Sequence, residues 1–321
     1  MESIYPFIWE NMMFTKSLAT RKSLIIPALM LVSLFFFYDA APAFAEGPTA
    51  SEYGVVLNLS GKQRMLTQKM SKEIVLIAMG HQTPANVKNL KKTAALFDKT
   101  LKGLRNGEAS LKLVPTSNPR ILRQLDKVDA IWANFQPVVQ TIIDQGSATN
   151  EQVAAVAQQN LPLLKQMNKC VKLYEKDASK AGMSSDPGLA VTINLSGKQR
   201  MLTQKMSKEF FIIAYGHDVE GNKLNLQETY TLFDRTLNGL LEGDASLDLP
   251  GTADPKIRAQ LTAVQNMWNK FQPSMAYGAS PATTTISTDK VGLVAGSNVP
   301  LLKNMNKAVK MYEKKAAGGT L

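Results

Sequence analysis

The sequence predicts an all-α protein built from two tandem up-down-up-down four-helix bundles. Apolar residues recur at alternating steps of three and four along each half of the chain, which is the period of an α-helix. The second half repeats the first with a period of 136 residues (194 − 58), which is too long for a solenoid and indicates duplicated domains. No segment shows the convincing period-two alternation that is typical of a β-strand.

Residues 1–45 are expected to form a cleaved signal peptide that precedes the fold. Arg21 and Lys22 stand before an apolar run over 24–38, and an Ala-Phe-Ala pattern at 43–45 is typical of a cleavage site. The run of about 15 residues is short for a membrane-spanning helix, which needs about 20. An uncleaved N-terminal anchor is the alternative. We expect no membrane span after cleavage, and a protein exported to the periplasm or secreted.

The first two helices of copy one are predicted over 55–80 and 84–106. The first carries a helical stripe of apolar positions with polar interruptions. It ends well at Gly80, because glycine readily adopts the left-handed conformation that follows a helix. Leu90 and Phe97 belong to the apolar stripe of the second helix. A loop rich in Gly, Ser, Pro and Asn then leads to the third helix.

The third helix is predicted over 119–145, and the fourth ends near residue 181. Both carry apolar stripes, with Trp132 as an expected core anchor of the third. Pro137 is expected to bend the third helix, and Pro162 either begins or kinks the fourth. The second copy repeats all four helices, and four antiparallel helices of this length form an up-down-up-down bundle.

The two copies define two expected domains, over 46–182 and 183–321. The linker between them, GMSSDPG at 182–188, leaves two geometries open. Either the last helix of copy one continues nearly straight into copy two, or the chain reverses and sets the bundles side by side with their first helices parallel. The turn-forming residues of the linker favour the reversal.

An identical segment of sixteen residues opens both copies. It reads NLSGKQRMLTQKMSKE at 58–73 and again at 194–209. The flanking sequence has drifted far more, although Met-Asn-Lys and Tyr-Glu-Lys triplets recur near the end of each copy at an offset of 138 (305 − 167). Packing alone tolerates swaps of similar volume, so two identical copies suggest that this segment contacts a ligand or its own twin.

Charge and cysteine content narrow the classes of partner. The net charge of +11 favours anionic partners, although a solvated basic surface explains it equally well. The expected export argues against nucleic acid as a partner.

Cys170 is the sole cysteine, and its counterpart Ala308 indicates that Cys170 is a small buried side chain that fills space in the core. No phosphate-binding loop, nucleophile elbow, paired carboxylates or zinc motif is visible, so we expect no enzyme, no cofactor and no metal site.

The repeated segment carries an arginine and a glycine on one helical face. Ser60, Arg64 and Ser71 share a polar stripe that borders the apolar one, which places Arg64 at the edge of a packing surface. A guanidinium group suits anions because its planar fork offers paired, permanently charged donors. A glycine inside a helix costs about 1 kcal/mol, so Gly61 and Gly197 require the close approach of a helix or a ligand. The alternative is a structural arginine, bonded to a carbonyl or carboxylate within a helix–helix interface.

The segment NLSGKQRMLTQKM resembles the first-helix motif of the PilJ-like domain, the N-terminal sensory domain of type IV pilus methyl-accepting chemotaxis transducers. It is similar also to the P-box helix of nitrate- and nitrite-responsive sensor histidine kinases. The resemblance is specific over about 16 residues, and with the helical pattern it covers most of the mature chain. It implies a periplasmic four-helix bundle. From the nitrate sensors it further implies an oxyanion held between two parallel first helices by P-box arginines.

The resemblance implies ligand-binding roles position by position. Arg64 matches the arginine of the motif, and Gly61 matches the glycine three residues earlier. The nitrate sensors carry a second arginine where this chain has Lys69, which keeps the charge but loses the fork, so specificity for nitrate stays open. The expected ligand-binding residues are Asn58, Gly61, Arg64, Gln68, Lys69, Asn194, Gly197, Arg200, Gln204 and Lys205.

Two functional hypotheses follow. In the first, the protein is a sensory protein that binds a small oxyanion, with Arg64 and Arg200 face to face in one pocket, and presents the bound state to a partner. In the second, it is a non-catalytic adaptor that docks to a membrane chemoreceptor, a sensor kinase or a pilus component without a small ligand.

Overall fold

A computed structural model of the chain describes residues 48–181 and 188–321. The expected signal peptide and most of the linker lie outside these residues. The helices of copy one are α1 (Ala50–Ala78), α2 (Thr83–Asn106), α3 (Pro119–Gln145) and α4 (Asn150–Lys180). The helices of copy two are α5 (Leu189–Tyr215), α6 (Val219–Glu242), α7 (Pro255–Ala279) and α8 (Thr288–Ala316). The predicted all-α fold and its tandem arrangement are confirmed.

The loop after α2 contains a short hairpin that the sequence did not predict. β1 (Gly107–Glu108) pairs antiparallel with β2 (Leu113–Pro115) around the 3-10 turn η1 (Ala109–Leu111). The strands are too short to show a period of two. Gly103 lets the hairpin lie against α2, because a Cβ at that position would meet the Cβ of Glu108 at 2.8 Å. Copy two keeps only the turn η2 (Ala245–Leu247) and a single bridge.

Side-chain caps fix several helix starts. A capping box between Thr49 and Glu52 begins α1 five residues earlier than predicted. Thr149 and Gln152 form a second capping box at the start of α4. Pro162 therefore lies inside a continuous helix and does not begin it.

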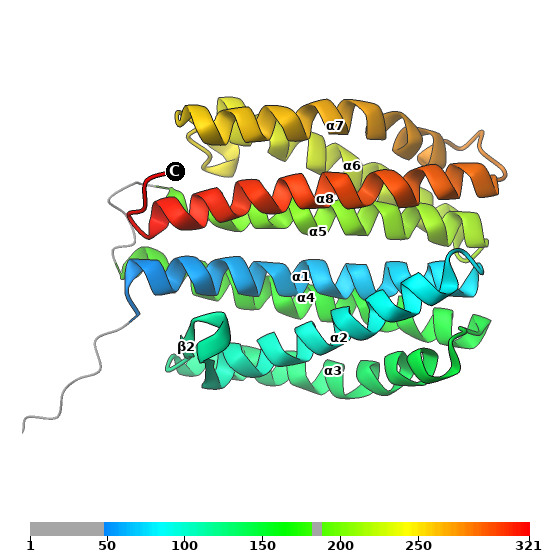
Figure 1. Cartoon of the computed structure of the whole chain (residues 1–321), viewed down its shortest axis with the longest axis horizontal. Helices are drawn as coiled ribbons and strands as arrows, with labels where there is room; N and C mark the ends of the chain where they lie inside the picture. Colours follow the sequence, from blue (N-terminus) through cyan, green and yellow to red (C-terminus); the bar gives the residue numbers. More distant parts are fainter. Residues whose placement is uncertain (1–47, 182–187) are drawn as a thin grey trace, which may run out of the picture. The chain divides into compact units, whose positions relative to one another are not determined.

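The two copies lie side by side, joined through their first helices. In Figure 1, α1, α4, α5 and α8 occupy the middle, with α2 and α3 on one side and α6 and α7 on the other. Lys72 of α1 bonds Asn298, which also bonds Ser207 of α5. Nearer the start of both helices, Arg64 bonds Asn194 and Arg200 bonds Asn58, so corresponding levels meet at two places and the helices run parallel. The reversed geometry is the one observed. No helix in the two described stretches combines the length and apolarity needed to cross a membrane.

The central position of α1 and α5 corrects one expectation. Each of them contacts helices of its own copy and of the other copy, so nearly all of their residues between the first turns and the last are buried. Arg64 is 2% exposed and lies inside the molecule, not at the edge of a packing surface as predicted. In the outer layers, Trp132 packs on Phe97 with ring centroids 4.6 Å apart and is a core anchor as expected.

Candidate functional site

Arg64 of α1 and Arg200 of α5 lie close together at the centre of the interface between the copies. Arg200 is 1% exposed, so both guanidinium groups are withdrawn from solvent. A Cβ at Gly61 would lie 3.4 Å from Nη2 of Arg64 and 3.6 Å from Nη2 of Arg200, and Gly197 has the same relation with the two arginines exchanged. Both are ordinary van der Waals distances, so a Cβ would fit at either glycine beside the guanidinium groups. The closer approach that the sequence led us to expect at Gly61 and Gly197 stays a prediction.

Arg64 donates to neutral oxygens of two other helices. Its Nη2 donates to the backbone carbonyl of Asn194 on α5 at 3.0 Å, and its Nη1 donates to Oδ1 of Asn168 on α4 at 3.2 Å. The side-chain amide of Asn194 in turn donates to Oε2 of Glu175 at 2.5 Å. The carboxylate of Glu175 therefore does not contact Arg64 directly, because Asn194 lies between them.

Arg200 repeats the arrangement with one additional bond. Its Nη2 donates to the backbone carbonyl of Asn58 at 2.9 Å, and its Nη1 donates to Oδ1 of Asn58 at 2.8 Å and to Oδ1 of Asn306 at 2.9 Å. Asn58 donates to Glu313 of α8, as Asn194 does to Glu175. Each arginine is therefore held by the first helix of the opposite copy and by the last helix of its own copy.

The charge at this centre is incompletely compensated. Within the described residues, neither arginine forms an ion pair, and the buried Nε atoms of both lack a hydrogen-bond partner. Burial lowers the pKa of Arg64 from about 12.5 to about 10. Burial, and next the charge of Arg64, lowers the pKa of Arg200 to about 9. Both stay protonated at neutral pH, so two like charges lie in a desolvated space. Glu175 and Glu313 offset these charges from one asparagine away.

The remaining predicted residues divide into two groups. Gln68 lies one turn beyond Arg64 on the same face, donates to Thr67, and has a buried Oε1 without a partner among the described residues. Gln204 is its counterpart, and its Oε1 is likewise without a partner. Both amides belong to the polar stripe that continues from the arginines along the interface.

Lys69 and Lys205 do not converge on the arginines. Lys69 pairs with Glu73 and donates to Oγ1 of Thr93 on α2 at 2.7 Å. Lys205 makes the equivalent contacts in copy two. They follow the arginines by five residues, which turns them toward the second helix of their own copy.

Four residues at the centre were not predicted as site residues. They are Asn168, Glu175, Asn306 and Glu313, which bond the arginines directly or through an asparagine. A signal was present, because they belong to the Met-Asn-Lys and Tyr-Glu-Lys triplets that both copies retain. Their position next to the first helices depends on tertiary packing, which the triplets alone do not reveal.

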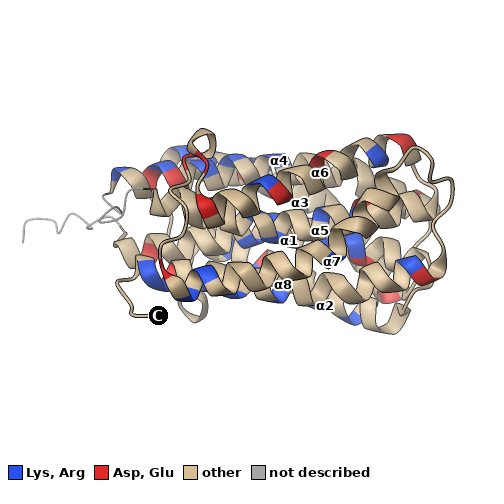
Figure 2. Ribbon diagram, turned by 90° about the horizontal axis from the view of Figure 1, so that it is seen from above, with Lys and Arg blue, Asp and Glu red and all other residues tan. Residues whose placement is uncertain are grey.

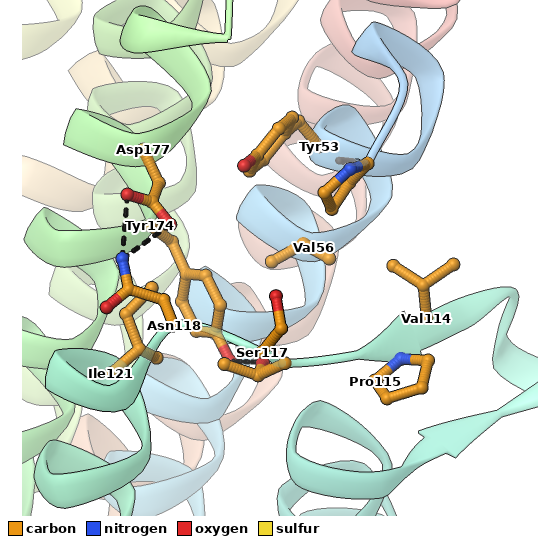
Figure 3. A pocket seen from close by; sticks show the side chains of 11 residues that line it. Tyr53, Val56, Val114, Pro115, Ser117, Asn118, Ile121, Tyr174 and Asp177 are labelled. Atoms are coloured by element: carbon orange, nitrogen blue, oxygen red, sulfur yellow. Dashed lines mark hydrogen bonds between the residues drawn. The ribbon is translucent and has the colours of Figure 1, made fainter. Parts of the chain in front are cut away.

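A separate small pocket lies at the start of α1, shown in Figure 3. Tyr53 and Asp177 line it, and Asn118 donates to both carboxylate oxygens of Asp177 at 2.9 and 2.8 Å. The cavity measures about 30 Å³, enough for about one water molecule. It lies eleven residues, about 16 Å along the helix, before Arg64. Four of its polar side chains bond in pairs, Thr116 with Tyr174 and Asn118 with Asp177, so we regard the pocket as part of the helix-end structure.

The fold and this centre define a class of all-helical proteins in which two equivalent bundles meet through their first helices. The chain belongs to the PilJ family, the N-terminal domain of type IV pili methyl-accepting chemotaxis transducers, whose profile matches residues 50–158 and again residues 183–292. The predicted family and its tandem duplication are thereby confirmed. Membership supports a sensory or adaptor role.

One curated relative adds to this assignment. Methyl-accepting chemotaxis protein McpN of Pseudomonas aeruginosa is 27% identical over 157 residues, which cover 49% of this chain and 29% of that protein. The chain thus spans less than a third of the length of that relative. No solved structure matches the chain.

Proposed function

We propose that the protein is an exported, periplasmic sensory protein that binds a small oxyanion between α1 and α5. The observation that carries this proposal is the pair of buried guanidinium groups beside Gly61 and Gly197, with neutral oxygens as their only bonded partners in the described residues. A purely structural arginine of this burial would be expected to pair with a carboxylate. Here the carboxylates stand one asparagine away, which leaves the centre receptive to an added negative charge.

Nitrate or nitrite is the ligand that the resemblance to the nitrate sensors suggests. The planar nitrate ion accepts paired hydrogen bonds in the geometry that a guanidinium fork donates. In this proposal, N–H groups of Arg64 and Arg200 that now donate to asparagine side-chain oxygens donate to the anion instead. The bonds to the backbone carbonyls of Asn58 and Asn194 keep the two guanidinium groups oriented. The bound state would then be presented to a membrane chemoreceptor or sensor kinase, with residues 1–45 as the export signal.

Thermal shifts of the purified chain with nitrate, nitrite, sulfate and chloride test the proposal. A ligand that binds only the folded state raises the melting temperature. We expect one oxyanion to raise it, and Arg64→Lys or Arg200→Lys to weaken binding by about 1.5–3 kcal/mol, because lysine keeps the charge and loses the fork. Arg120→Lys, at an exposed position on α3, is the control. No shift with any anion, or equal shifts in all three variants, would make the two arginines structural.

A basic groove on α4 favours the adaptor hypothesis as a second candidate. Its volume is about 420 Å³, and its lining includes Leu161 and Leu164 beside Lys165, Lys169 and Lys172. Figure 2 shows basic residues recurring along α4 and α8. An acidic surface of a membrane partner would be complementary to this groove. Reversing two charges with Lys165→Glu and Lys169→Glu is expected to abolish association with such a partner while leaving any nitrate shift intact, as measured by co-sedimentation and thermal shift.

A further inference from the structure

A second polar cavity lies where the end of α1 and the start of α2 meet α8 of the other copy. It measures about 210 Å³. Its walls include Lys69, Lys72 and Glu73 from α1 and His81 from the loop that follows. These residues are distinct from the arginine pair, so a ligand held here does not depend on the function proposed above.

The cavity carries a net positive charge on buried groups. Lys72 is 6% exposed, and its one hydrogen bond in the described residues goes to Oδ1 of Asn298 on α8 at 2.9 Å. Lys69 neutralises Glu73, which is 1% exposed. Two ammonium groups and one carboxylate leave one positive charge over. Burial lowers the pKa of Lys72 to about 8 and raises the pKa of Glu73, so both groups are held away from water.

Two polar atoms of the cavity residues lack partners. They are Oε2 of Glu73 and Nε2 of His81, both buried. The loop that carries His81 is fixed in place, because Asn86 donates to the carbonyl of His81 at 2.8 Å and Gln82 holds a left-handed φ of 45°. A fixed loop with an unpartnered nitrogen, beside a carboxylate with an unpartnered oxygen, provides one donor and one acceptor for a bound molecule.

Part of the lining is apolar and is open to solvent. Leu76 is buried, and Ala295 and Val299 of α8 are the other apolar residues of the lining, with Val299 43% exposed. The polar side chains of Gln82, Asn86 and Asn89 complete the cavity. A ligand that fits this cavity therefore combines one negative charge with a short hydrocarbon segment.

We propose that this cavity binds a short-chain carboxylate, with its carboxylate group at the ammonium groups of Lys69 and Lys72 and its hydrocarbon segment against Leu76 and Val299. A 2-hydroxy acid suits the site better than the corresponding acid without the hydroxyl, because the hydroxyl donates to the unpartnered oxygen of Glu73. Lactate and propionate are the matched probes.

Copy two provides the comparison. In copy two, Asp218 takes the place of Gln82. The net charge of the corresponding cavity residues is therefore zero, from Lys205, Lys208, Glu209 and Asp218. We therefore expect one carboxylate bound per chain.

Isothermal titration of the purified chain with lactate and propionate tests the proposal. Val299→Trp fills the mouth of the cavity. Leu161→Trp is the matched control at the corresponding position of α4 in copy one, where the side chain is 45% exposed. We expect lactate to bind with one site per chain, to bind more tightly than propionate, and to weaken by at least about tenfold in Val299→Trp but not in Leu161→Trp. Binding that is equal in both variants, or no binding to the unchanged protein, overturns the proposal.

Two further variants separate this site from the arginine pair. Lys72→Gln is expected to abolish lactate binding, and its circular dichroism shows whether it folds. Arg64→Lys is expected to leave lactate binding unchanged. If Arg64→Lys removes lactate binding, the carboxylate occupies the arginine centre and the separate site is refuted.

Discussion

At the scale of single residues, the direction of helical side chains explains why each arginine bonds the opposite copy. A side chain on an α-helix leans toward the N-terminus of its helix. Arg64 therefore meets the facing helix at Asn194, the counterpart of Asn58, which stands six residues earlier in the repeat. Gly61 and Gly197 leave the space in between free of side-chain atoms other than the guanidinium groups themselves.

The glycines give a prediction that separates ligand binding from stability. In the double variant Gly61→Ala with Gly197→Ala, each new Cβ would lie 3.4 and 3.6 Å from the Nη2 atoms, which are ordinary contact distances. Alanine favours a helix over glycine by up to about 1 kcal/mol per site, so urea denaturation should show equal or higher stability. Nitrate affinity should fall by at least about tenfold, because the methyl groups occupy the space that the anion needs.

Gly296 on α8 supplies the control for this prediction, because a Cβ there meets nothing within 4 Å. Gly296→Ala should raise stability and leave nitrate binding as it was. Unchanged nitrate affinity in the double glycine variant would place the anion elsewhere.

At the scale of helices, α1 and α5 are exceptional because they are surrounded. Lys72 of α1 bonds Asn298 of α8, and Lys208 of α5 bonds Asn160 of α4, so buried ammonium groups join the first helix of each copy to the last helix of the other. The polar residues within the apolar stripes of these two helices predict an amphipathic helix with one polar face. That side faces another helix instead of water, which is why the exposure of Arg64 was mispredicted.

These lysines predict a pH dependence of stability. Burial lowers the pKa of Lys72 and Lys208 to about 8 from the ordinary value of 10.5. Between these values the unfolded chain binds more protons than the folded one, so the free energy of unfolding rises as pH increases from about 8 toward 10.5. The gain is on the order of 1–3 kcal/mol per lysine.

Urea denaturation at pH 7.5, 9 and 10 measures this slope. Lys72→Met and Lys208→Met should reduce the slope between pH 7.5 and 9, since methionine has similar length and no charge. Above pH 9 a slope remains in these variants, because the pKa of Arg200 is lowered to about 9 and that of Arg64 to about 10. A slope that is the same in the double variant and in the unchanged protein would assign the pH dependence to other groups.

At the scale of the whole molecule, the sequence predicted the architecture better than the site. The apolar stripes and the repeat identified the eight helices of the described residues and the duplication. They did not reveal that Asn168 and Glu175 join the arginine centre, because contacts between α4 and α1 depend on how whole helices pack. The hairpin after α2 was missed because strands of two and three residues show no period.

The duplication predicts the behaviour of one copy expressed alone. A chain over 46–181 would expose the α1 surface that α5 covers, and residues 58–73 are identical to 194–209. We expect this fragment to form a dimer through α1 that recreates the arginine pair, and nitrate to favour the dimer. Sedimentation equilibrium with and without nitrate measures both effects. A monomeric fragment that binds nitrate with the full affinity of the intact chain would contradict a shared site.

Because the two copies are covalently connected, the arginine centre does not dissociate when the protein is diluted. A centre shared by separate subunits separates once the protein concentration falls below the dissociation constant of the subunits. Here the second half is held at the high effective concentration that a short tether imposes, whatever the number of molecules around it. Each molecule of this chain therefore contains both halves of the arginine centre.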